Sequence, residues 1–162
     1  MKSVLTAAVL GLLAAPAFAE GDPVKGQKSF NRCKSCHAVT SDTGENIIKG
    51  GKTGPNLWGV VGRTAGTYEG FKYGDDLIAA GAGGLVWDAE NFAAFTADPR
   101  GFLRAHLDDS KAKSKMSFKL KKGAEDIFAF LAQHGPVVEE APEEDVSEEA
   151  VEATETTEEA AS

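Results

Sequence analysis

The chain has 162 residues, of which 42% are hydrophobic and 26% charged, as expected for one globular domain with short extensions. Two cysteines exclude a disulfide-rich scaffold, and no apolar run reaches the roughly 18 residues of a transmembrane segment. The formal net charge of −8 argues against a protein that binds nucleic acid.

Residues 1–19 have the pattern of a secretory signal peptide. A single lysine precedes an apolar run over residues 4–15, and Ala17-Phe18-Ala19 is a small-x-small cleavage site. An N-terminal core helix is the alternative, but the short run and the Ala-x-Ala end favour a signal. We expect cleavage after Ala19 and export of the mature protein to a bacterial periplasm.

The first helix is predicted to begin at Asp22-Pro23 and to run toward Arg32. Asp is a favoured N-cap residue, and proline is tolerated in the first helical turn. Gly26 and Phe30 are four residues apart and therefore share one face of this helix. A residue as small as glycine on that face permits a close crossing with another helix.

The most specific motif is Cys33-Lys34-Ser35-Cys36-His37. A Cys-x-x-Cys pair alone fits a redox dithiol, half of a zinc site or a haem attachment site. A thioredoxin-like dithiol would follow a strand, and a zinc site would need a second ligand pair that the chain lacks. The adjacent histidine fits haem, whose two vinyl groups accept the thiols while the imidazole becomes the proximal iron ligand. The motif predicts one haem c, bound covalently by Cys33 and Cys36, with His37 as a metal ligand.

Residues 38–66 are rich in glycine and are predicted to form a loop. A short helix is expected around residues 75–80. Another is capped by Asp88 and ends before Pro99, because the residue before a proline disfavours the helical conformation.

Met116 is the only methionine outside the predicted signal peptide. A methionine usually fills a gap in a core, but this one lies on a Lys-rich stretch that suits core packing poorly. A thioether is a soft, neutral ligand that favours ferrous iron and raises the reduction potential of haem. Met116 is therefore predicted to be the second axial metal ligand, with His106 and His134 as weaker rivals.

The last helix is predicted over about residues 124–134, where Gly135-Pro136 ends it. Its apolar stripe consists of Ile127, Phe128, Phe130 and Leu131. Residues 137–162 follow and contain eleven Asp and Glu, no Lys or Arg, and no aromatic residue. This composition predicts a disordered acidic tail. A passive extension is the preferred interpretation, and a solubilising tail or an intramolecular decoy for basic patches is the functional alternative.

Charge is segregated between the predicted domain and the tail. Residues 20–136 contain 14 acidic and 16 basic residues, a net charge of +2, against −11 for the tail. Six of the sixteen basic residues lie in residues 111–122, where no acidic residue occurs. The sequence therefore predicts a basic face on a near-neutral domain.

Four segments together resemble the class I c-type cytochromes. They are Phe30-Asn-Arg-Cys-Lys-Ser-Cys-His37, Thr53-Gly-Pro-Asn-Leu57, Val61-Gly-Arg63 and Ser114-Lys-Met116. The resemblance spans about residues 21–135 and is closest to the soluble periplasmic cytochromes c of purple photosynthetic and denitrifying alphaproteobacteria. It implies an all-α cytochrome c fold, in which short helices and long loops wrap around one covalently bound haem.

The resemblance also implies roles for residues around the haem. The carbonyl of Pro55 would accept a hydrogen bond from the proximal histidine and fix its tautomer. Arg63, Tyr73 and Trp87 resemble residues near a haem propionate, and Ser114 resembles the hydroxyl before the methionine ligand.

The first and last helices of the family cross, which here would bring Gly26 and Phe30 against Phe130 and Leu131. The chain departs from the family at Phe95, where many members have a tyrosine near the methionine sulfur.

Two axial protein ligands would leave no open iron position, so the expected function is outer-sphere electron transfer by a monomer that is not an enzyme. The basic face would steer encounters with membrane complexes that carry acidic docking patches. By resemblance, electrons come from the quinol–cytochrome c oxidoreductase and go to a terminal oxidase, a photosynthetic reaction centre or a periplasmic reductase. The alternatives are a five-coordinate c-type haem protein that binds a small gas or acts on peroxide, and a redox-sensing or structural haem module.

Overall fold

The computed structural model describes residues 21–136, so the predicted signal peptide and acidic tail lie outside the described residues. The elements in chain order are α1 (Pro23–Ser29), the 3-10 turn η1 (Phe30–Arg32), β1 (Val39–Thr40), β2 (Asn46–Ile48), α2 (Asp75–Ala82), α3 (Ala89–Ala97), α4 (Pro99–His106) and α5 (Ala124–Ala132). No helix within residues 21–136 is long and apolar enough to cross a membrane.

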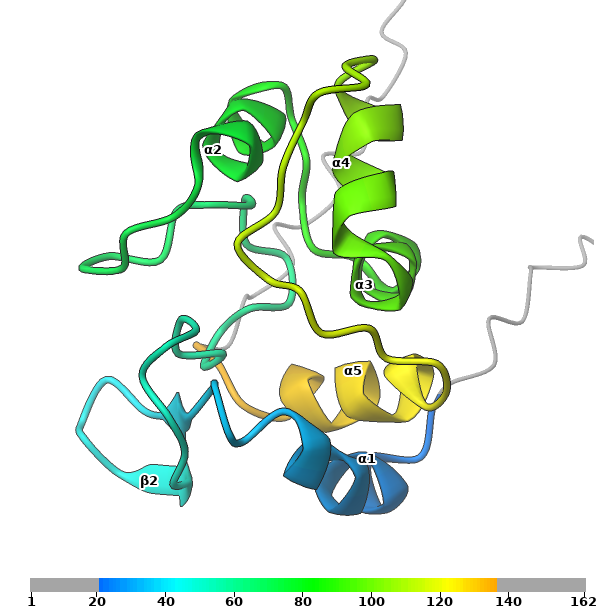
Figure 1. The fold of residues 1–162 in the computed structure, drawn as a ribbon. Helices are drawn as coiled ribbons and strands as arrows, with labels where there is room; N and C mark the ends of the chain where they lie inside the picture. Colours follow the sequence, from blue (N-terminus) through cyan, green and yellow to red (C-terminus); the bar gives the residue numbers. More distant parts are fainter. Residues whose placement is uncertain (1–20, 137–162) are drawn as a thin grey trace, which may run out of the picture.

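The first and last helices of the described chain, α1 and α5, pack against each other (Figure 1). A Cβ atom on Gly26 would overlap the backbone carbonyl of Asp126 and lie 2.8 Å from the Cβ of Phe130. The rings of Phe30 and Phe130 pack with centroids 5.8 Å apart. The predicted contact of Gly26 and Phe30 with the last helix is therefore confirmed, and it requires glycine at position 26.

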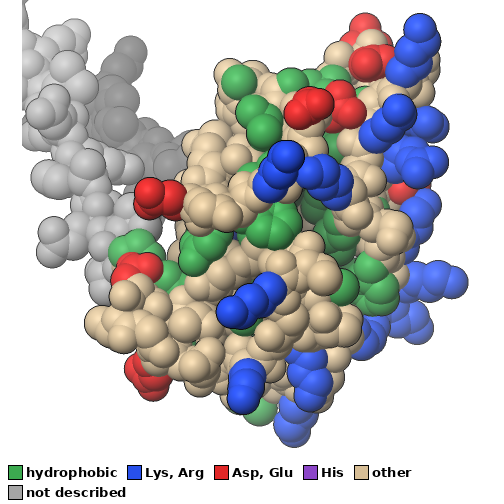
Figure 2. All heavy atoms as spheres, turned by 60° about the vertical axis from the view of Figure 1, so that its left-hand side comes forward, with side chains coloured by type: hydrophobic (Ala, Val, Ile, Leu, Met, Phe, Trp, Pro, Cys, Tyr) green, Lys and Arg blue, Asp and Glu red, His purple; other side chains and the backbone are tan. Residues whose placement is uncertain are grey.

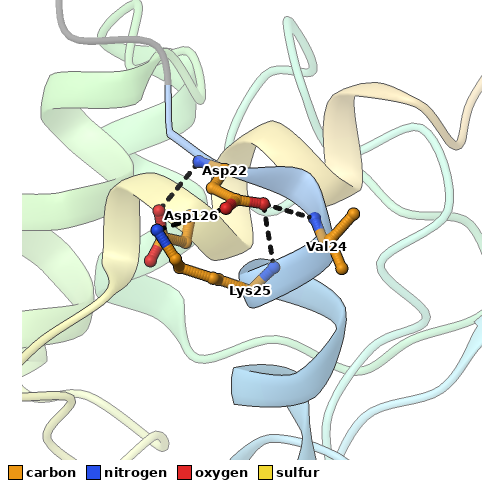
Figure 3. Close-up of polar contacts among 4 residues, drawn as sticks. All are labelled: Asp22, Val24, Lys25 and Asp126. Atoms are coloured by element: carbon orange, nitrogen blue, oxygen red, sulfur yellow. Dashed lines mark hydrogen bonds and ion pairs between the residues drawn. The ribbon is translucent and has the colours of Figure 1, made fainter.

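The beginning of α1 is capped by Asp22 and tied to α5 by one hydrogen bond (Figure 3). The Asp22 carboxylate accepts hydrogen bonds from the backbone N–H groups of Val24 and Lys25, as expected of an N-cap. The backbone N–H of Asp22 donates to the Asp126 carboxylate at 2.8 Å. This bond fixes the chain entering α1 against the first turn of α5.

The prediction that residues 38–66 form only a loop is wrong in one place, because this segment contains a short β-hairpin. Strands β1 and β2 pair antiparallel, with Val39 opposite Ile48 and Thr40 opposite Asn46. The β-branched residues of the two strands favour this pairing, and Val39 is completely buried. Strands of two and three residues are too short to show a clear alternation of apolar and polar residues, and glycines flank them in the sequence.

The remaining helices surround the segment that joins α4 to α5, residues 107–123, which runs through the middle of the view in Figure 1. Helices α2 and α3 lie where they were predicted. Pro99 does end α3, and it also begins α4, because the Asp98 carboxylate accepts a hydrogen bond from the Gly101 N–H at 3.2 Å. Helix α3 packs against both α4 and α5. The most deeply buried large side chains are Phe30, Val39, Leu85, Pro99, Leu103, Ile127 and Leu131.

Candidate haem site

All four predicted site residues line one cavity of about 600 Å³. Cys33, Cys36 and His37 follow η1, whereas Met116 comes from the segment before α5. Much of the remaining wall is apolar, with aromatic side chains that include Trp87, Phe92, Phe95 and Phe118. Figure 2 shows hydrophobic side chains in the middle of one face, with Lys and Arg side chains around them. The chain thus combines two thiols, an imidazole and a thioether in one largely apolar pocket.

A hydrogen bond from Nδ1 of the ring orients the His37 imidazole. Its Nδ1 lies 2.8 Å from the carbonyl oxygen of Pro55. Because a carbonyl only accepts, Nδ1 carries the proton and Nε2 keeps the lone pair that a metal ligand needs. Burial lowers the pKa of His37, while the Pro55 hydrogen bond acts in the opposite direction. The expected contact with Pro55 is confirmed.

Gly54 allows the backbone to lie directly against this ring. A Cβ atom at position 54 would be 2.6 Å from His37 Nδ1, closer than non-bonded atoms approach. Glycine is therefore required in the Thr53-Gly54-Pro55 segment so that Pro55 can reach the imidazole.

The two thiols follow η1 in a tight turn. The backbone N–H groups of Cys36 and His37 both donate to the Cys33 carbonyl at 3.0 Å. Burial raises the pKa of the half-buried Cys33 thiol. Hydrogen bonds from Thr53 and Ser35 lower the pKa of the exposed Cys36 thiol. Both cysteines are free and line the cavity, so both sulfurs are available to form thioethers.

The segment that carries Met116 is tied to residues 72–76, some of which also line the cavity. The Lys115 ammonium donates to the backbone carbonyls of Lys72 at 3.0 Å and Tyr73 at 2.8 Å. The backbone N–H of Lys113 donates to Asp76 Oδ2 at 2.8 Å. Lys115 therefore clamps the methionine segment, a role that the sequence analysis missed because nothing in a lysine-rich stretch distinguishes one ammonium from another.

The two rival histidines are elsewhere. His106 is exposed and stacks on Phe102, with ring centroids 5.6 Å apart. The ring of His134 packs edge-on against the ring of Phe130, with centroids 4.7 Å apart. Neither lines the cavity, and all three histidines of the chain lie within residues 21–136. His37 is therefore the one histidine in the cavity wall.

Arg63, Tyr73 and Trp87 also line the cavity. The Arg63 guanidinium donates to the backbone carbonyls of Trp58 at 2.9 Å and Asn56 at 3.4 Å. Burial lowers the pKa of Arg63 and raises the pKa of Tyr73. A cationic and a phenolic donor in a half-buried wall suit an anionic group such as a haem propionate.

Asn56 lies between Pro55 and Leu57, which line the cavity, and the sequence analysis assigned it no role. Its amide nitrogen donates to the Thr40 carbonyl at 2.7 Å and to the Tyr68 hydroxyl at 3.0 Å. Its amide oxygen accepts from the N–H groups of Thr40 and Trp58. The sequence does offer one indication of this role, the position of Asn56 between a proline and a leucine. A polar side chain that is buried among such residues needs hydrogen-bond partners inside the protein.

Comparison with known proteins decides the family. No family model matches the sequence. The chain is 67% identical over 119 residues to cytochrome c-551 of Roseobacter denitrificans, which covers 74% of this chain and 85% of that protein. It is 57% identical over 134 residues to cytochrome c2 of Rhodobacter capsulatus. This match covers 82% of this chain and 97% of that protein. The chain belongs to the class I c-type cytochromes.

The solved structures agree with this assignment. The structure of cytochrome c2 from Rhodobacter capsulatus superimposes with a TM-score of 0.67 and 56% identity, over 69% of this chain and 97% of that chain. Ferric cytochrome c-550 from Paracoccus versutus superimposes with a TM-score of 0.69 and 50% identity, over 71% of this chain and 98% of that chain. The predicted cytochrome c fold is confirmed, and the cofactor of this cytochrome is one covalently bound haem c.

Proposed function

We propose that this cytochrome is a one-electron carrier in which Cys33 and Cys36 hold haem c through thioethers and His37 and Met116 are the axial ligands. The main support is that these four side chains, from segments far apart in the sequence, line the same cavity. When bound, haem supplies a reversible one-electron couple. His37 Nε2 and the Met116 sulfur would hold the iron and leave no position for a substrate, so the protein would be a carrier rather than an enzyme.

The axial ligation is tested with Met116→Ala, using optical spectra of the oxidised and reduced haem-loaded protein. The wild type should show the weak far-red charge-transfer band of Met–iron ligation, and the variant should lack it. The variant's reduction potential should fall by a sizeable part of the roughly 0.8 V over which axial ligands set haem potentials.

His106→Ala and His134→Ala are the matched controls, because they remove the rival ligands, and both should keep the band. A wild type that is high-spin and binds carbon monoxide readily would instead indicate a five-coordinate haem protein.

Lys115→Gln should loosen the methionine segment by removing its two hydrogen bonds to the carbonyls of Lys72 and Tyr73. A loss of about 1 kcal/mol corresponds to roughly fivefold faster binding of imidazole to the ferric protein. Stopped-flow absorbance measures this rate. Lys113→Gln, with the same change in charge in the same segment, should bind imidazole at the wild-type rate. Equal rates for the two variants would contradict the clamp.

We also propose that the chain is exported to the periplasm after cleavage behind Ala19, and that it works there as a monomer. Its electron donor would be the membrane quinol–cytochrome c oxidoreductase, and its acceptor a terminal oxidase, a photosynthetic reaction centre or a periplasmic reductase. The exposed lysines of residues 111–122 support docking to acidic surfaces, because they flank Met116 on both sides in the chain.

Salt should slow this docking. Between about 0.1 M and 1 M salt the Debye length falls from about 10 Å to about 3 Å, so the rate of reduction by the quinol–cytochrome c oxidoreductase should fall roughly tenfold or more. Lys121→Gln should weaken the salt dependence, whereas Lys28→Gln on α1 should leave it unchanged. A rate that does not respond to salt would contradict docking through these lysines.

A further inference from the structure

The lysine face, defined here as the six lysines of residues 111–122, is incompletely neutralised by the described part of the chain. Its members are Lys111, Lys113, Lys115, Lys119, Lys121 and Lys122, and all are exposed. Within residues 21–136 the one ion pair on this face joins Lys119 Nζ to Asp98 Oδ1 at 2.9 Å. The Lys115 ammonium is held by two carbonyls.

Apart from Asp98, two acidic residues bind the backbone of this face rather than its ammonium groups. Asp109 Oδ1 accepts a hydrogen bond from the Lys111 backbone N–H, and Asp76 Oδ2 accepts one from the Lys113 backbone N–H, each at 2.8 Å. Four ammonium groups of the face therefore make neither an ion pair nor a hydrogen bond with any residue between positions 21 and 136.

Residues 137–162 carry the complementary charge. They contain eleven acidic and no basic residues, whereas residues 20–136 have a net charge of +2. The segment follows Pro136, whose position is set by a hydrogen bond from the Gly59 N–H to the His134 carbonyl at 2.8 Å. At about 3.3 Å per residue, 26 residues span at most roughly 86 Å. A domain of this size has a radius of gyration of about 13 Å, so every face lies within reach.

We propose that residues 137–162 bind the lysine face of their own chain and so compete with acidic partners for it. Tethering gives the carboxylates an effective concentration on the order of millimolar at the face without any partner present. The contact is electrostatic and needs no fixed conformation of the acidic segment. Salt therefore weakens it over the Debye length. The contact itself does not depend on the proposed electron-carrier function, although its consequence for partners does.

Zero-length carbodiimide cross-linking of the full, haem-loaded chain tests the contact directly, since it joins a carboxylate to an ammonium only where the two touch. At low ionic strength we expect cross-links from residues 137–162 to Lys111, Lys113, Lys121 and Lys122, located by mass spectrometry. About 0.5 M salt should abolish them. Cross-links spread evenly over all lysines, or their absence, would overturn the proposal.

A mixture of isotopically labelled and unlabelled protein distinguishes the two possible sources of the carboxylates. Cross-links within one chain support the proposal, and cross-links mainly between chains overturn it in favour of association between copies.

Two double variants with the same change in net charge provide the control. Lys121→Gln/Lys122→Gln should lower the cross-linking yield at the two remaining unpaired lysines severalfold, because the attraction is shared over the face. Lys28→Gln/Lys49→Gln, on α1 and beside β2, should leave it within about 20% of the wild type. Equal losses in both variants would show that net charge alone matters and would overturn the proposed site. Optical spectra of all variants report Met116 ligation separately, so failure of this contact and failure of the carrier proposal remain distinguishable.

Discussion

The double variant Cys33→Ala/Cys36→Ala is expected to lose most of its helical structure, because it cannot retain haem c covalently. The wall residues, Trp87, Phe92 and Phe95 among them, surround a cavity of about 600 Å³. Without haem, these apolar side chains would face water instead of the cofactor, and the burial of apolar area is the main favourable contribution to folding. The side chains alone therefore cannot maintain the native packing.

Far-ultraviolet circular dichroism measures the loss, which we expect to halve the helical signal or reduce it further. Ser35→Ala is the matched control, since Ser35 lies between the two cysteines and its hydroxyl is 3.7 Å from the Cys36 sulfur. This control should keep its haem and its helices. A double variant with native helicity would show that the polypeptide folds without the covalent cofactor.

The parts of the fold that the sequence predicted are those with local causes. Asp22 and Asp88 cap helices where their side-chain chemistry requires it. The Cys33–His37 motif identified the haem because its residue types and spacing leave few other chemistries. Fold and family were predicted correctly for the same reason, since several short motifs fall in the right order along one chain.

The parts that the sequence did not predict depend on contacts between distant segments. The Lys115 ammonium binds carbonyls more than forty positions away, and a backbone carbonyl leaves no signature in the sequence. The Asn56 side chain joins β1 to the loop containing Tyr68 through three hydrogen bonds, two with the Thr40 backbone and one with the Tyr68 hydroxyl. The hairpin of β1 and β2 is too short for its alternation to stand out among glycines.

Gly26→Val should lower the free energy of unfolding of the haem-loaded protein by at least about 3 kcal/mol, as expected for a severe overpacking substitution. The added Cβ would overlap the backbone carbonyl of Asp126, which cannot rotate away as a side chain can, and would lie 2.8 Å from the Cβ of Phe130. Helices α1 and α5 would have to separate, which would open the packing of Phe30 against Phe130.

Guanidinium unfolding followed by circular dichroism measures this change, with Gln27→Val as the matched control. Gln27 is exposed on the same helix, so valine there incurs only the helix-propensity difference of about 0.5 kcal/mol. Equal stabilities of the two variants would contradict a close-packed crossing. Because α1 continues through η1 into Cys33, separation of the helices would also displace the turn that carries both thiols and His37. We therefore expect Gly26→Val, unlike Gln27→Val, to reduce the yield of haem-loaded protein, which links the helix crossing at the ends of the domain to the haem site.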